Sequence, residues 1–418
     1  MSEVVGGAGV RHEIICGDVL AGLRLLPDRL VQCVVTSPPY WNLRNYGVEG
    51  QIGLEPSPEE YVATMVAVFR EVRRVLRDDG TLWLNLGDSY TSGGRSNHGT
   101  RVGYKQQTNR GSSGTCDAPR PQLPPGLKPK DLVGIPWRVA FALQADGWYL
   151  RSDIIWSKSA CVTSTAEDKP NSMPESVISR PTKSHEYIFL LAKRDRYFYD
   201  ADAIHEPVTS DRVRGPAKHP SKDTNGNDGL CRRPIGEWRN RRTVWEIATQ
   251  PTPEAHFATF PGALVEPCIK AGTSERGCCP VCGAPWRRVT DRGKDAGLAR
   301  SAGGKADDQP ETDRAKRLGQ RRNAARVAGG DHTNPFGGRM TTHWAPTCTC
   351  NAGDPIPCVV LDPFGGSGTV AKVARDLGRS SVLIELNPEY VAIMKKKLRV
   401  GEQLDTGVCE YVVREVRA

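Results

Sequence analysis

Short apolar runs alternate with longer stretches of helical periodicity in the first part of the chain. EIICGD (13–18) and VQCVVT (31–36) are short apolar runs, which predict buried strands. Residues 59–76 carry apolar side chains at helical spacing and are followed by the turn sequence DDG, so we predict a helix that ends before a third strand at 81–88. Strands that alternate with helices in this way predict a mostly parallel sheet with helices on both faces.

The same alternation returns after a polar interruption. A helix is predicted at 135–148, strands at 151–158 and 185–193, and a further helix around 262–271. The final segment, 358–398, predicts a strand, a glycine loop, a helix, a strand and a helix in that order. The apolar pattern therefore predicts an α/β fold whose parts are separated by polar segments.

Three polar segments interrupt this pattern. Residues 91–115 are rich in Gly, Ser, Arg and Asn and predict a mobile surface loop. Residues 205–242 end in the basic run RRPIGEWRNRR, and residues 272–355 form a polar insertion bracketed by cysteines. None of the three continues the pattern of strands and helices.

Composition narrows the class of protein. The 418 residues can bury a large core, and the chain has no run of about 18 apolar residues, so we expect no membrane span. The N-terminus has no apolar signal core, so we expect a cytoplasmic protein. A net charge of +9 fits either a solvated basic surface or a polyanionic partner. The 13 cysteines predict reduced thiols, with any cluster binding a metal.

The glycine loop VVLDPFGGSGT (359–369) predicts a ligand pocket. Asp362 stands at the end of a strand, and the glycines in the following turn would let a ligand approach the backbone. Glu385 ends the next strand, at roughly the 20-residue spacing of the acidic residue that contacts ribose in dinucleotide folds. The glycine spacing differs from G-x-G-x-x-G, and Asp362-Pro363 would crowd a pyrophosphate. A single nucleoside with a positively charged group, such as S-adenosylmethionine, therefore fits better than a dinucleotide.

A second motif, VVTSPPYWNL (34–43), ends a predicted core strand with two consecutive prolines. Proline has no backbone donor and fixes φ, so the pair stops a sheet ladder and makes a rigid corner. Beside the glycine loop, TSPPY (36–40) resembles the catalytic motif of DNA amino-methyltransferases, which methylate the N4 amine of cytosine or the N6 amine of adenine. The resemblance extends to DPFGGSGT (362–369), HFATFPGALVEPCIKAG (256–272) and RPTKSHEYIFLLAK (180–193). Because the catalytic motif precedes the cofactor motif, the chain resembles the permuted β group of this family.

The resemblance implies a fold, a reaction and partners. The implied fold is the S-adenosylmethionine-dependent methyltransferase fold, a circularly permuted, Rossmann-like α/β fold with a mostly parallel seven-stranded sheet. The implied reaction is site-specific methylation of double-stranded DNA by base flipping and direct transfer from S-adenosyl-L-methionine, with a cognate restriction endonuclease as a candidate partner. The implied segments are a catalytic half (1–204, with a mobile loop at 91–130), a basic target-recognition segment (205–255), a cofactor-side helix (256–271), a Cys-rich insertion (272–357) and a cofactor-binding half (358–418).

Four residues of the corner would carry the chemistry by this resemblance: Ser37, Pro38, Pro39 and Tyr40. An exocyclic amine is a poor nucleophile because its lone pair is delocalised into the base. The Ser37 hydroxyl and the Pro38 carbonyl can accept the amine hydrogens and draw the nitrogen toward tetrahedral geometry. The prolines would hold that carbonyl in place, and Tyr40 would stack on the extruded base.

The resemblance also assigns residues around the cofactor and the target base. The cofactor residues are Asp18, Thr36, Phe257, Thr259, Phe260, Pro261, Asp362, Pro363, Phe364, Gly365, Gly366, Ser367, Gly368, Thr369, Glu385 and Asn387. His185 and Glu186 precede a strand that is expected beside the target pocket.

The identity of the target base stays open between two candidates. In this family SPPY favours cytosine N4 and an Asp in place of the Ser favours adenine N6, so Ser37 favours cytosine, with N6-adenine as the alternative. A zinc-containing DNA-binding protein without catalysis is a more remote alternative, which the intact motifs argue against. A dinucleotide oxidoreductase would leave the Pro-Pro corner unexplained.

A structural metal site is predicted in the Cys-rich insertion. Cys279-x-x-Cys282 is typical of a zinc knuckle, and Cys348-x-Cys350 would complete a four-thiolate zinc site. Alternative ligands are Cys268, Cys278 and His343. Such a metal would hold the fold of the insertion and take no part in methyl transfer.

Target recognition is expected from three arginine-bearing polar segments, 91–130, 205–245 and 272–355. They lie outside the sheet pattern, as elements that contact a DNA groove should.

Overall fold

The computed structural model describes most of the chain: residues 9–91, 126–158, 178–207, 238–249, 260–292, 339–400 and 409–416. The chain divides into two compact units. The larger comprises residues 1–204, 242–287 and 345–418, and the smaller comprises residues 205–241 and 288–344. Every residue of the candidate active site described below lies in the larger unit.

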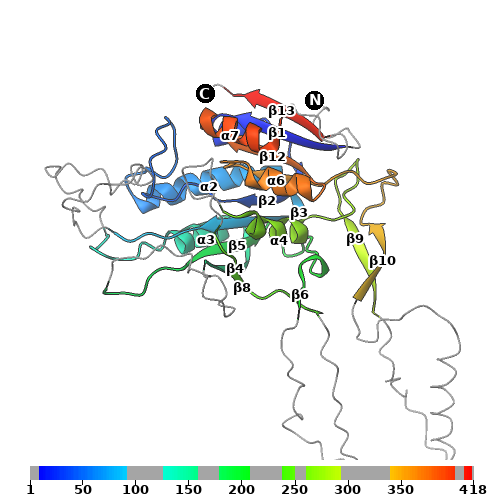
Figure 1. Ribbon diagram of the computed structural model, residues 1–418, viewed down its shortest axis with the longest axis horizontal. Coiled ribbons are helices and arrows are strands. Elements are labelled where there is room, and N and C mark those ends of the chain that lie inside the picture. Colours follow the sequence, from blue (N-terminus) through cyan, green and yellow to red (C-terminus); the bar gives the residue numbers. More distant parts are fainter. Residues whose placement is uncertain are drawn as a thin grey trace, which may run out of the picture. The chain divides into compact units, whose positions relative to one another are not determined.

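The larger unit contains a nine-stranded sheet with the order β13-β1-β12-β11-β2-β3-β5-β4-β8 (Figure 1). The strands are β1 (Val10–Cys16), β2 (Val31–Thr36), β3 (Leu76–Leu86), β4 (Tyr149–Ser157), β5 (His185–Ala192), β8 (Val244–Glu246), β11 (Val359–Asp362), β12 (Ser380–Glu385) and β13 (Cys409–Glu415). Strand β5 runs antiparallel to both β3 and β4, and the other neighbouring pairs are parallel. The predicted mostly parallel sheet is confirmed, and the antiparallel β5 makes it a mixed sheet.

The sheet has nine strands, whereas seven were expected, and the two additional strands lie at its edges. Strand β13 adds to β1, and β8 adds to β4. The β8 strand is only three residues long and lies in the segment 205–255, which reads as polar in the sequence. A three-residue edge strand forms because it pairs with its neighbour β4, and it is too short to show a hydrophobic pattern in the sequence.

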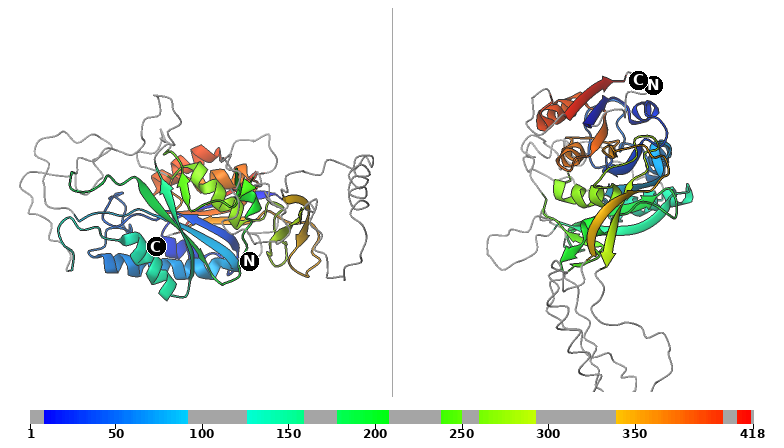
Figure 2. Two further views of the ribbon diagram at one scale, coloured as in Figure 1. Left: turned by 90° about the horizontal axis from the view of Figure 1, so that it is seen from below. Right: turned by 90° about the vertical axis from the view of Figure 1, so that its right-hand side faces the viewer.

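Alternating residues of the central strands face two different helical layers. Val34 of β2 packs in a cluster with the helices α1 (Val19–Arg24), α2 (Pro58–Val75) and α3 (Ile135–Ala145). Its neighbours Cys33 and Val35 pack on the other face. The helices there are α4 (Gly262–Gly272) and α6 (Thr369–Asp376), and α7 (Pro388–Leu398) joins them by packing on β1 and β12. The left view of Figure 2 shows the blue helices on one side of the strands and the green and orange helices on the other. The sheet is therefore covered on both faces, as the sequence predicts.

The boundary between α2 and β3 differs from the prediction. The helix begins where Ser57 caps it, its side chain accepting a hydrogen bond from the Glu60 amide at 3.2 Å. At its other end the backbone turns extended at Leu76, and β3 starts there without an intervening turn. The predicted turn at 78–80 lies within the strand, where Asp78 forms ion pairs of 3.0 and 2.7 Å with Lys193 and Arg194.

Two short two-stranded ribbons lie outside the main sheet, and the β6–β7 ribbon is antiparallel. One pairs β9 (Trp286–Arg292) with β10 (Arg339–Pro346), and the other pairs β6 (Glu206–Pro207) with β7 (Trp238–Arg239). The short 3-10 helix η2 (Asp202–Ile204) precedes β6. Among the described helices, none combines the length and the hydropathy that a membrane crossing requires.

Candidate active site

The two sequence motifs leave the sheet from adjacent parallel strands. Val360 and Leu361 of β11 pair with Cys33 and Val34 of β2. The carboxyl ends of parallel strands meet at one edge of a sheet, so the Ser-Pro-Pro-Tyr corner and the glycine loop begin side by side. The structure thus brings together two motifs that are far apart in the sequence.

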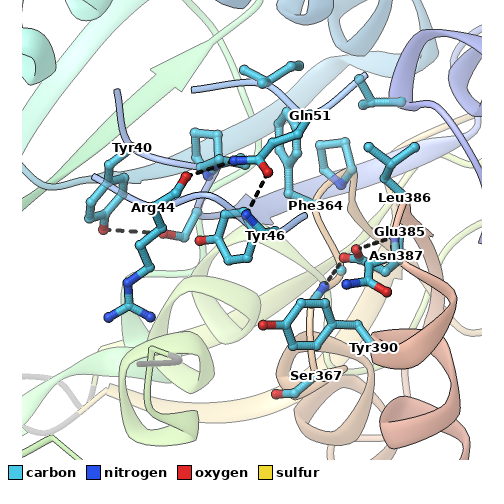
Figure 3. A pocket seen from close by; sticks show the side chains of 18 of the residues that line it. Tyr40, Arg44, Tyr46, Gln51, Phe364, Ser367, Glu385, Leu386, Asn387 and Tyr390 are labelled. Carbon is cyan, nitrogen blue, oxygen red and sulfur yellow. Dashed lines mark hydrogen bonds between the residues drawn. The ribbon is translucent and has the colours of Figure 1, made fainter. Parts of the chain in front are cut away.

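Both motifs line one cavity of about 400 Å³ (Figure 3). The residues assigned to the site from the sequence that line it are Asp18, Ser37, Pro38, Pro39, Tyr40, Phe260, Pro363, Phe364, Gly365, Gly366, Ser367, Thr369, Glu385 and Asn387. Thr36, Pro261, Asp362 and Gly368 belong to the same segments without being part of the lining. Phe257, Thr259, residues 92–125 and most of the basic segment, 208–237, lie outside the described residues.

The glycine loop is closely packed against its neighbours. The Gly366 amide donates to Glu385 Oε2 at 2.7 Å, and the Gly365 amide donates to the Ile384 carbonyl at 2.8 Å. Gly368 has φ +76°, and a Cβ at this position would lie 2.5 Å from Cγ of Met394. Glycine is therefore required at 368 both for its backbone conformation and for space.

Two carboxyl groups lie at the glycine-loop end of the site, Asp362 buried and Glu385 half-buried. Asp362 is 1% exposed, and burial raises the pKa of its carboxyl to about 7, with the charge of Glu385 adding to the shift. Its Oδ1 accepts from the Thr36 hydroxyl at 2.7 Å and from the Phe364 amide at 3.1 Å, whereas Oδ2 is buried and has no hydrogen-bond partner among the described residues. Burial also raises the pKa of Glu385. An unpaired buried oxygen beside a second carboxyl group favours a cationic ligand, because a positive charge would compensate for the lost solvation.

Other predicted cofactor residues have local structural partners. Asp18 caps α1 by accepting from the Ala21 amide at 2.9 Å, and Asn387 caps α7 by accepting from the Glu389 amide at 2.9 Å. The hydroxyls of Ser367 and Thr369 accept from Lys397 Nζ at 3.2 and 3.0 Å. These contacts fix the backbone that surrounds the cavity.

The Ser-Pro-Pro-Tyr corner is held from outside by buried neighbours. The Tyr61 hydroxyl of α2 donates to the Pro39 carbonyl at 2.8 Å, and Trp41 Nε1 donates to the Glu55 carbonyl at 3.0 Å. The Tyr40 ring lies against Gly87, where an added Cβ would be 2.5 Å from Cε2 of the ring. The corner therefore has little freedom to move when a ligand binds.

A polar network joins the corner to three strand ends. The Tyr40 hydroxyl donates to Glu186 Oε2 at 2.7 Å and lies 3.3 Å from Ser37 Oγ. Asn85 accepts from Ser37 at 3.3 Å and donates to Glu186 at 3.2 Å, and Lys158 forms an ion pair with Glu186 Oε1. Burial first, and then the Glu186 charge, raises the pKa of Tyr40 well above its usual value, so its hydroxyl stays protonated.

Asn85 and Lys158 are cavity residues that the sequence analysis missed. The signal for Asn85 is a single polar residue within the apolar run TLWLNL, and Lys158 directly follows a predicted strand. Glu186 lies in the cavity lining, whereas His185 is absent from that lining. The His185 ring packs edge-on against Tyr187, and burial lowers its pKa.

A loop that follows the corner forms part of the cavity wall. Gln51 Oε1 accepts from the Tyr46 amide at 2.6 Å, and Gln51 Nε2 donates to the Arg44 carbonyl at 2.7 Å. The Tyr46 ring packs edge-on against Tyr390 of α7, with 6.3 Å between the ring centroids (Figure 3). This wall was not predicted, because its contacts join residues 46 and 390.

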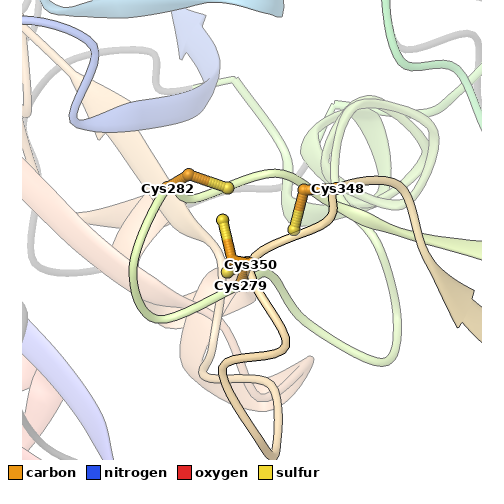
Figure 4. A group of neighbouring side chains, drawn as sticks. All are labelled: Cys279, Cys282, Cys348 and Cys350. Atoms are coloured by element: carbon orange, nitrogen blue, oxygen red, sulfur yellow. The ribbon is translucent and has the colours of Figure 1, made fainter.

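The four predicted zinc ligands gather outside the active site. The Sγ atoms of Cys279, Cys282, Cys348 and Cys350 all lie within 4.8 Å of one another (Figure 4). Of the alternative ligands, Cys268 is buried in α4, where its thiol donates to the Leu264 carbonyl, Cys278 is buried against Pro357, and His343 Nδ1 contacts the Thr342 hydroxyl. The arrangement matches a four-thiolate site of the kind that zinc prefers.

The cysteine cluster is anchored at the opposite end of the strands from the cavity. Gln32, near the start of β2, donates to the Gly283 carbonyl at 3.2 Å, and Arg77, near the start of β3, donates to the Cys282 carbonyl. The active-site motifs follow the carboxyl end of β2. A metal at this cluster would therefore be remote from the chemistry.

The sheet, the glycine loop and the Ser-Pro-Pro-Tyr corner around one cavity place the chain among α/β proteins with a ligand cavity at the carboxyl edge of the sheet. The DNA methylase family model for N6 and N4 enzymes matches residues 31–279 and 326–396, and the chain belongs to this family. It is therefore a DNA amino-methyltransferase, as the sequence motifs suggested.

Similar proteins cover nearly the whole chain. The Type II methyltransferase M.Cfr9I of Citrobacter freundii is 40% identical over 94% of this chain and 88% of its own length. The Type II methyltransferase M.SmaI of Serratia marcescens is 39% identical over 92% of this chain and 90% of its own length. Among solved structures, the cytosine-N4-specific PvuII DNA methyltransferase is 16% identical with a TM-score of 0.47, covering 97% of this chain and 92% of that one.

Proposed function

We propose that the protein transfers a methyl group from S-adenosyl-L-methionine to the exocyclic N4 amine of cytosine at a specific site in double-stranded DNA. The observation that supports this most directly is the shared cavity, which is lined by the glycine loop at one end and by Ser37 and Tyr40 at the other. A methyl donor and a base amine bound at these two ends would face each other without any intermediate carrier.

The cofactor end fits S-adenosylmethionine by charge and by shape. The unpaired Oδ2 of Asp362 would accept a hydrogen bond from the ammonium of the methionine part, and the Glu385 carboxyl would accept from the ribose hydroxyls. The glycines at 365 and 366 allow the ligand to approach the loop backbone. When bound there, the cofactor supplies an electrophilic methyl group on a sulfonium.

The catalytic corner would prepare the amine. The Ser37 hydroxyl oxygen and the Pro38 carbonyl would each accept one amine hydrogen, which localises the nitrogen lone pair toward the methyl group. Because Tyr61 and Gly87 hold the corner from outside, these acceptors are placed before the base arrives. Tyr40 would stack on the base after it leaves the duplex.

Cytosine is preferred over adenine because of Ser37. In the amino-methyltransferases that this chain resembles, a serine before Pro-Pro-Tyr favours cytosine N4 and an aspartate favours adenine N6. Methylation of adenine N6 by the same fold is the second candidate. The intact cavity argues against a DNA-binding protein without catalysis.

We also infer that the four cysteines bind a structural Zn²⁺. Four thiols with this mutual spacing match a closed tetrahedral site. The hydrogen bonds from Gln32 and Arg77 to the carbonyls of Gly283 and Cys282 attach this site to the core. The metal would stabilise the insertion without touching either substrate.

Recognition of the DNA sequence is assigned to the polar segments 91–130, 205–245 and 272–355, which carry much of the arginine of the chain. Their phosphate and base contacts would position the double-stranded DNA over the cavity. A cognate restriction endonuclease is a candidate functional partner, because the similar proteins are named Type II methyltransferases.

Mass spectrometry of nucleosides tests this proposal. Plasmid DNA from a methylation-deficient strain is incubated with the purified protein and S-adenosylmethionine, and N4-methylcytosine is the expected product. N6-methyladenine would instead establish the second candidate. If the protein binds DNA but forms neither nucleoside, both methyl-transfer proposals fail.

A further inference from the structure

The hydrogen-bond chain that starts at Ser37 ends at a carboxylate inside the cavity. Ser37 Oγ lies 3.3 Å from the Tyr40 hydroxyl, and that hydroxyl donates to Glu186 Oε2 at 2.7 Å. The other carboxylate oxygen of Glu186 is paired with Lys158 Nζ. A hydroxyl, a phenol and a carboxylate thus lie in sequence, beginning at the group that would contact the amine.

Transfer of a methyl group to an amine leaves one proton to be removed. The bond between the sulfonium sulfur and the methyl carbon breaks as the bond from nitrogen to that carbon forms, and the nitrogen then carries a positive charge. Loss of one N–H proton restores the neutral base. The site therefore needs a group that can take this proton close to the amine.

Among the described residues, three carboxyl groups line the cavity, and one of these three is hydrogen-bonded to the catalytic corner. Asp18 caps α1, and Glu385 accepts from the amides of Gly366 and Asn387. Glu186 alone among the three bonds to Tyr40. Asn85 also accepts from Ser37, but its amide cannot take up a proton near neutral pH.

We propose that Glu186 is the terminal proton acceptor of the methyl transfer, reached from Ser37 through the Tyr40 hydroxyl, with Lys158 as its counter-ion. The amine proton passes to Ser37 Oγ as the Ser37 proton passes to the Tyr40 oxygen and the Tyr40 proton passes to Glu186 Oε2. Ser37 and Tyr40 end neutral, and Glu186 ends protonated. This inference rests on the proposed methyl transfer, and it holds for either target base.

The surroundings of Glu186 suit this role. Asn85 fixes the orientation of the carboxylate by donating to Oε2 at 3.2 Å and to the Tyr187 carbonyl at 3.1 Å. The pKa of Tyr40 is raised by burial and by the Glu186 charge, so the phenol hands on a proton only as it receives one. His185, next along β5, has a pKa lowered by burial and stays neutral near pH 7, which leaves Lys158 as the cation paired with the carboxylate.

Single-turnover kinetics with three variants test the relay. Glu186→Gln keeps an acceptor for the Tyr40 hydroxyl but cannot take the proton, and Tyr40→Phe keeps the ring but removes the relay oxygen. We expect each to lower the methyl-transfer rate by about 100-fold, the lower end of the usual range for general acid–base groups. The double variant should be no slower than the slower single variant, because both changes interrupt one path.

Binding measurements separate this role from a structural one. Dissociation constants for S-adenosylmethionine and for DNA should stay within about twofold of the wild-type values. Glu410→Gln, at an exposed glutamate near the start of the edge strand β13, is the control for loss of a carboxylate and should react at the wild-type rate.

The relay is overturned if either single variant loses less than about tenfold in rate. It is also overturned if the two losses multiply in the double variant. If Glu186→Gln fails to fold, Tyr40→Phe still tests the relay, because a wild-type methyl-transfer rate without the Tyr40 hydroxyl would exclude proton transfer through that hydroxyl. Absence of any methylated base with the wild-type protein would refute the proposed function itself, which is a different outcome.

Discussion

The Thr36 hydroxyl donates a 2.7 Å hydrogen bond to Asp362 Oδ1, and this bond joins two motifs that lie 326 positions apart in the chain. Thr36 ends β2 and precedes the catalytic corner, whereas Asp362 ends β11 and precedes the glycine loop. Both side chains are buried. The bond therefore fixes the spacing between the place where the amine is held and the place where the methyl donor is held.

Cofactor affinity should depend on pH through Asp362. Its pKa is raised to about 7, so below that pH the carboxyl is neutral and loses its attraction for the cationic cofactor. Calorimetric titration from about pH 7.5 down to about pH 5.5 should show weakening affinity for S-adenosylmethionine in the wild type. Asp362→Asn should bind about 10–100-fold more weakly at the higher pH, the loss expected for one charge-assisted hydrogen bond, and should show a flatter pH profile.

A matched control for this prediction is Asp376→Asn, on the same side of the sheet but paired with Lys372 at 2.7 Å. Asp376→Asn should keep the wild-type dependence of S-adenosylmethionine affinity on pH. Equal S-adenosylmethionine affinity of Asp362→Asn and the wild type at every pH would contradict the role of Asp362 in cofactor binding. The free energy of unfolding of the cofactor-free protein should also depend on pH through Asp362. Folding raises the pKa of this carboxyl from 3.8 to about 7, so its contribution to stability decreases as the pH increases from 3.8 to about 7.

Changes in the catalytic corner should separate transfer from cofactor binding. Tyr40→Ala removes the stacking face, and Pro38→Ala loosens the carbonyl that accepts an amine hydrogen, so each should lower the transfer rate by about 100-fold or more. Affinity for S-adenosylmethionine should change little, because neither side chain belongs to the cofactor end. Filter-bound transfer of a labelled methyl group and calorimetry measure the two quantities. Parallel loss of both would point to a folding defect.

Gly87 should matter for activity although it carries no side chain. In Gly87→Ala the new methyl would lie 2.5 Å from Cε2 of Tyr40, so the ring must shift. A displacement of this kind should cost about 10–100-fold in transfer rate, because misplacement near 1 Å is enough to disturb a prepared site. The melting temperature and the cofactor affinity serve as internal references. A wild-type rate in this variant would show that the ring position is unimportant.

Metal analysis should find one zinc ion per chain, and Cys348→Ser should lose it. Cys268→Ala removes a thiol outside the cluster and should keep the metal. Chelation should lower the melting temperature while the fraction of protein that remains folded keeps its affinity for S-adenosylmethionine, because the cluster is anchored at the starts of β2 and β3. A metal-free protein with an unchanged melting temperature would contradict the zinc proposal.

Much of the fold could be predicted because its signals are local. The apolar run 31–36 became β2 with the predicted ends, and the helical spacing of 59–76 became α2 with a shift of one residue. Edge strand β8 could not be predicted in this way, since three residues hold no periodicity and gain their structure from β4. The Cys279 and Cys282 pair was recognisable from its spacing, but only folding brings Cys348 and Cys350 to it across the long insertion.

The sequence by itself determined the chemistry that the chain carries: a hydroxyl before two prolines, an aromatic ring, a glycine bend and acidic strand ends. These features follow from residue types and short spacings, which can be recognised in the sequence without the three-dimensional structure. Only the tertiary structure decided which groups work together, because Asn85 near the end of β3, Lys158 just after β4 and Glu186 near the start of β5 meet at one edge of the sheet. The hydrogen bonds and the burial of these side chains depend on contacts between residues far apart in the sequence, and no local sequence pattern predicts such contacts.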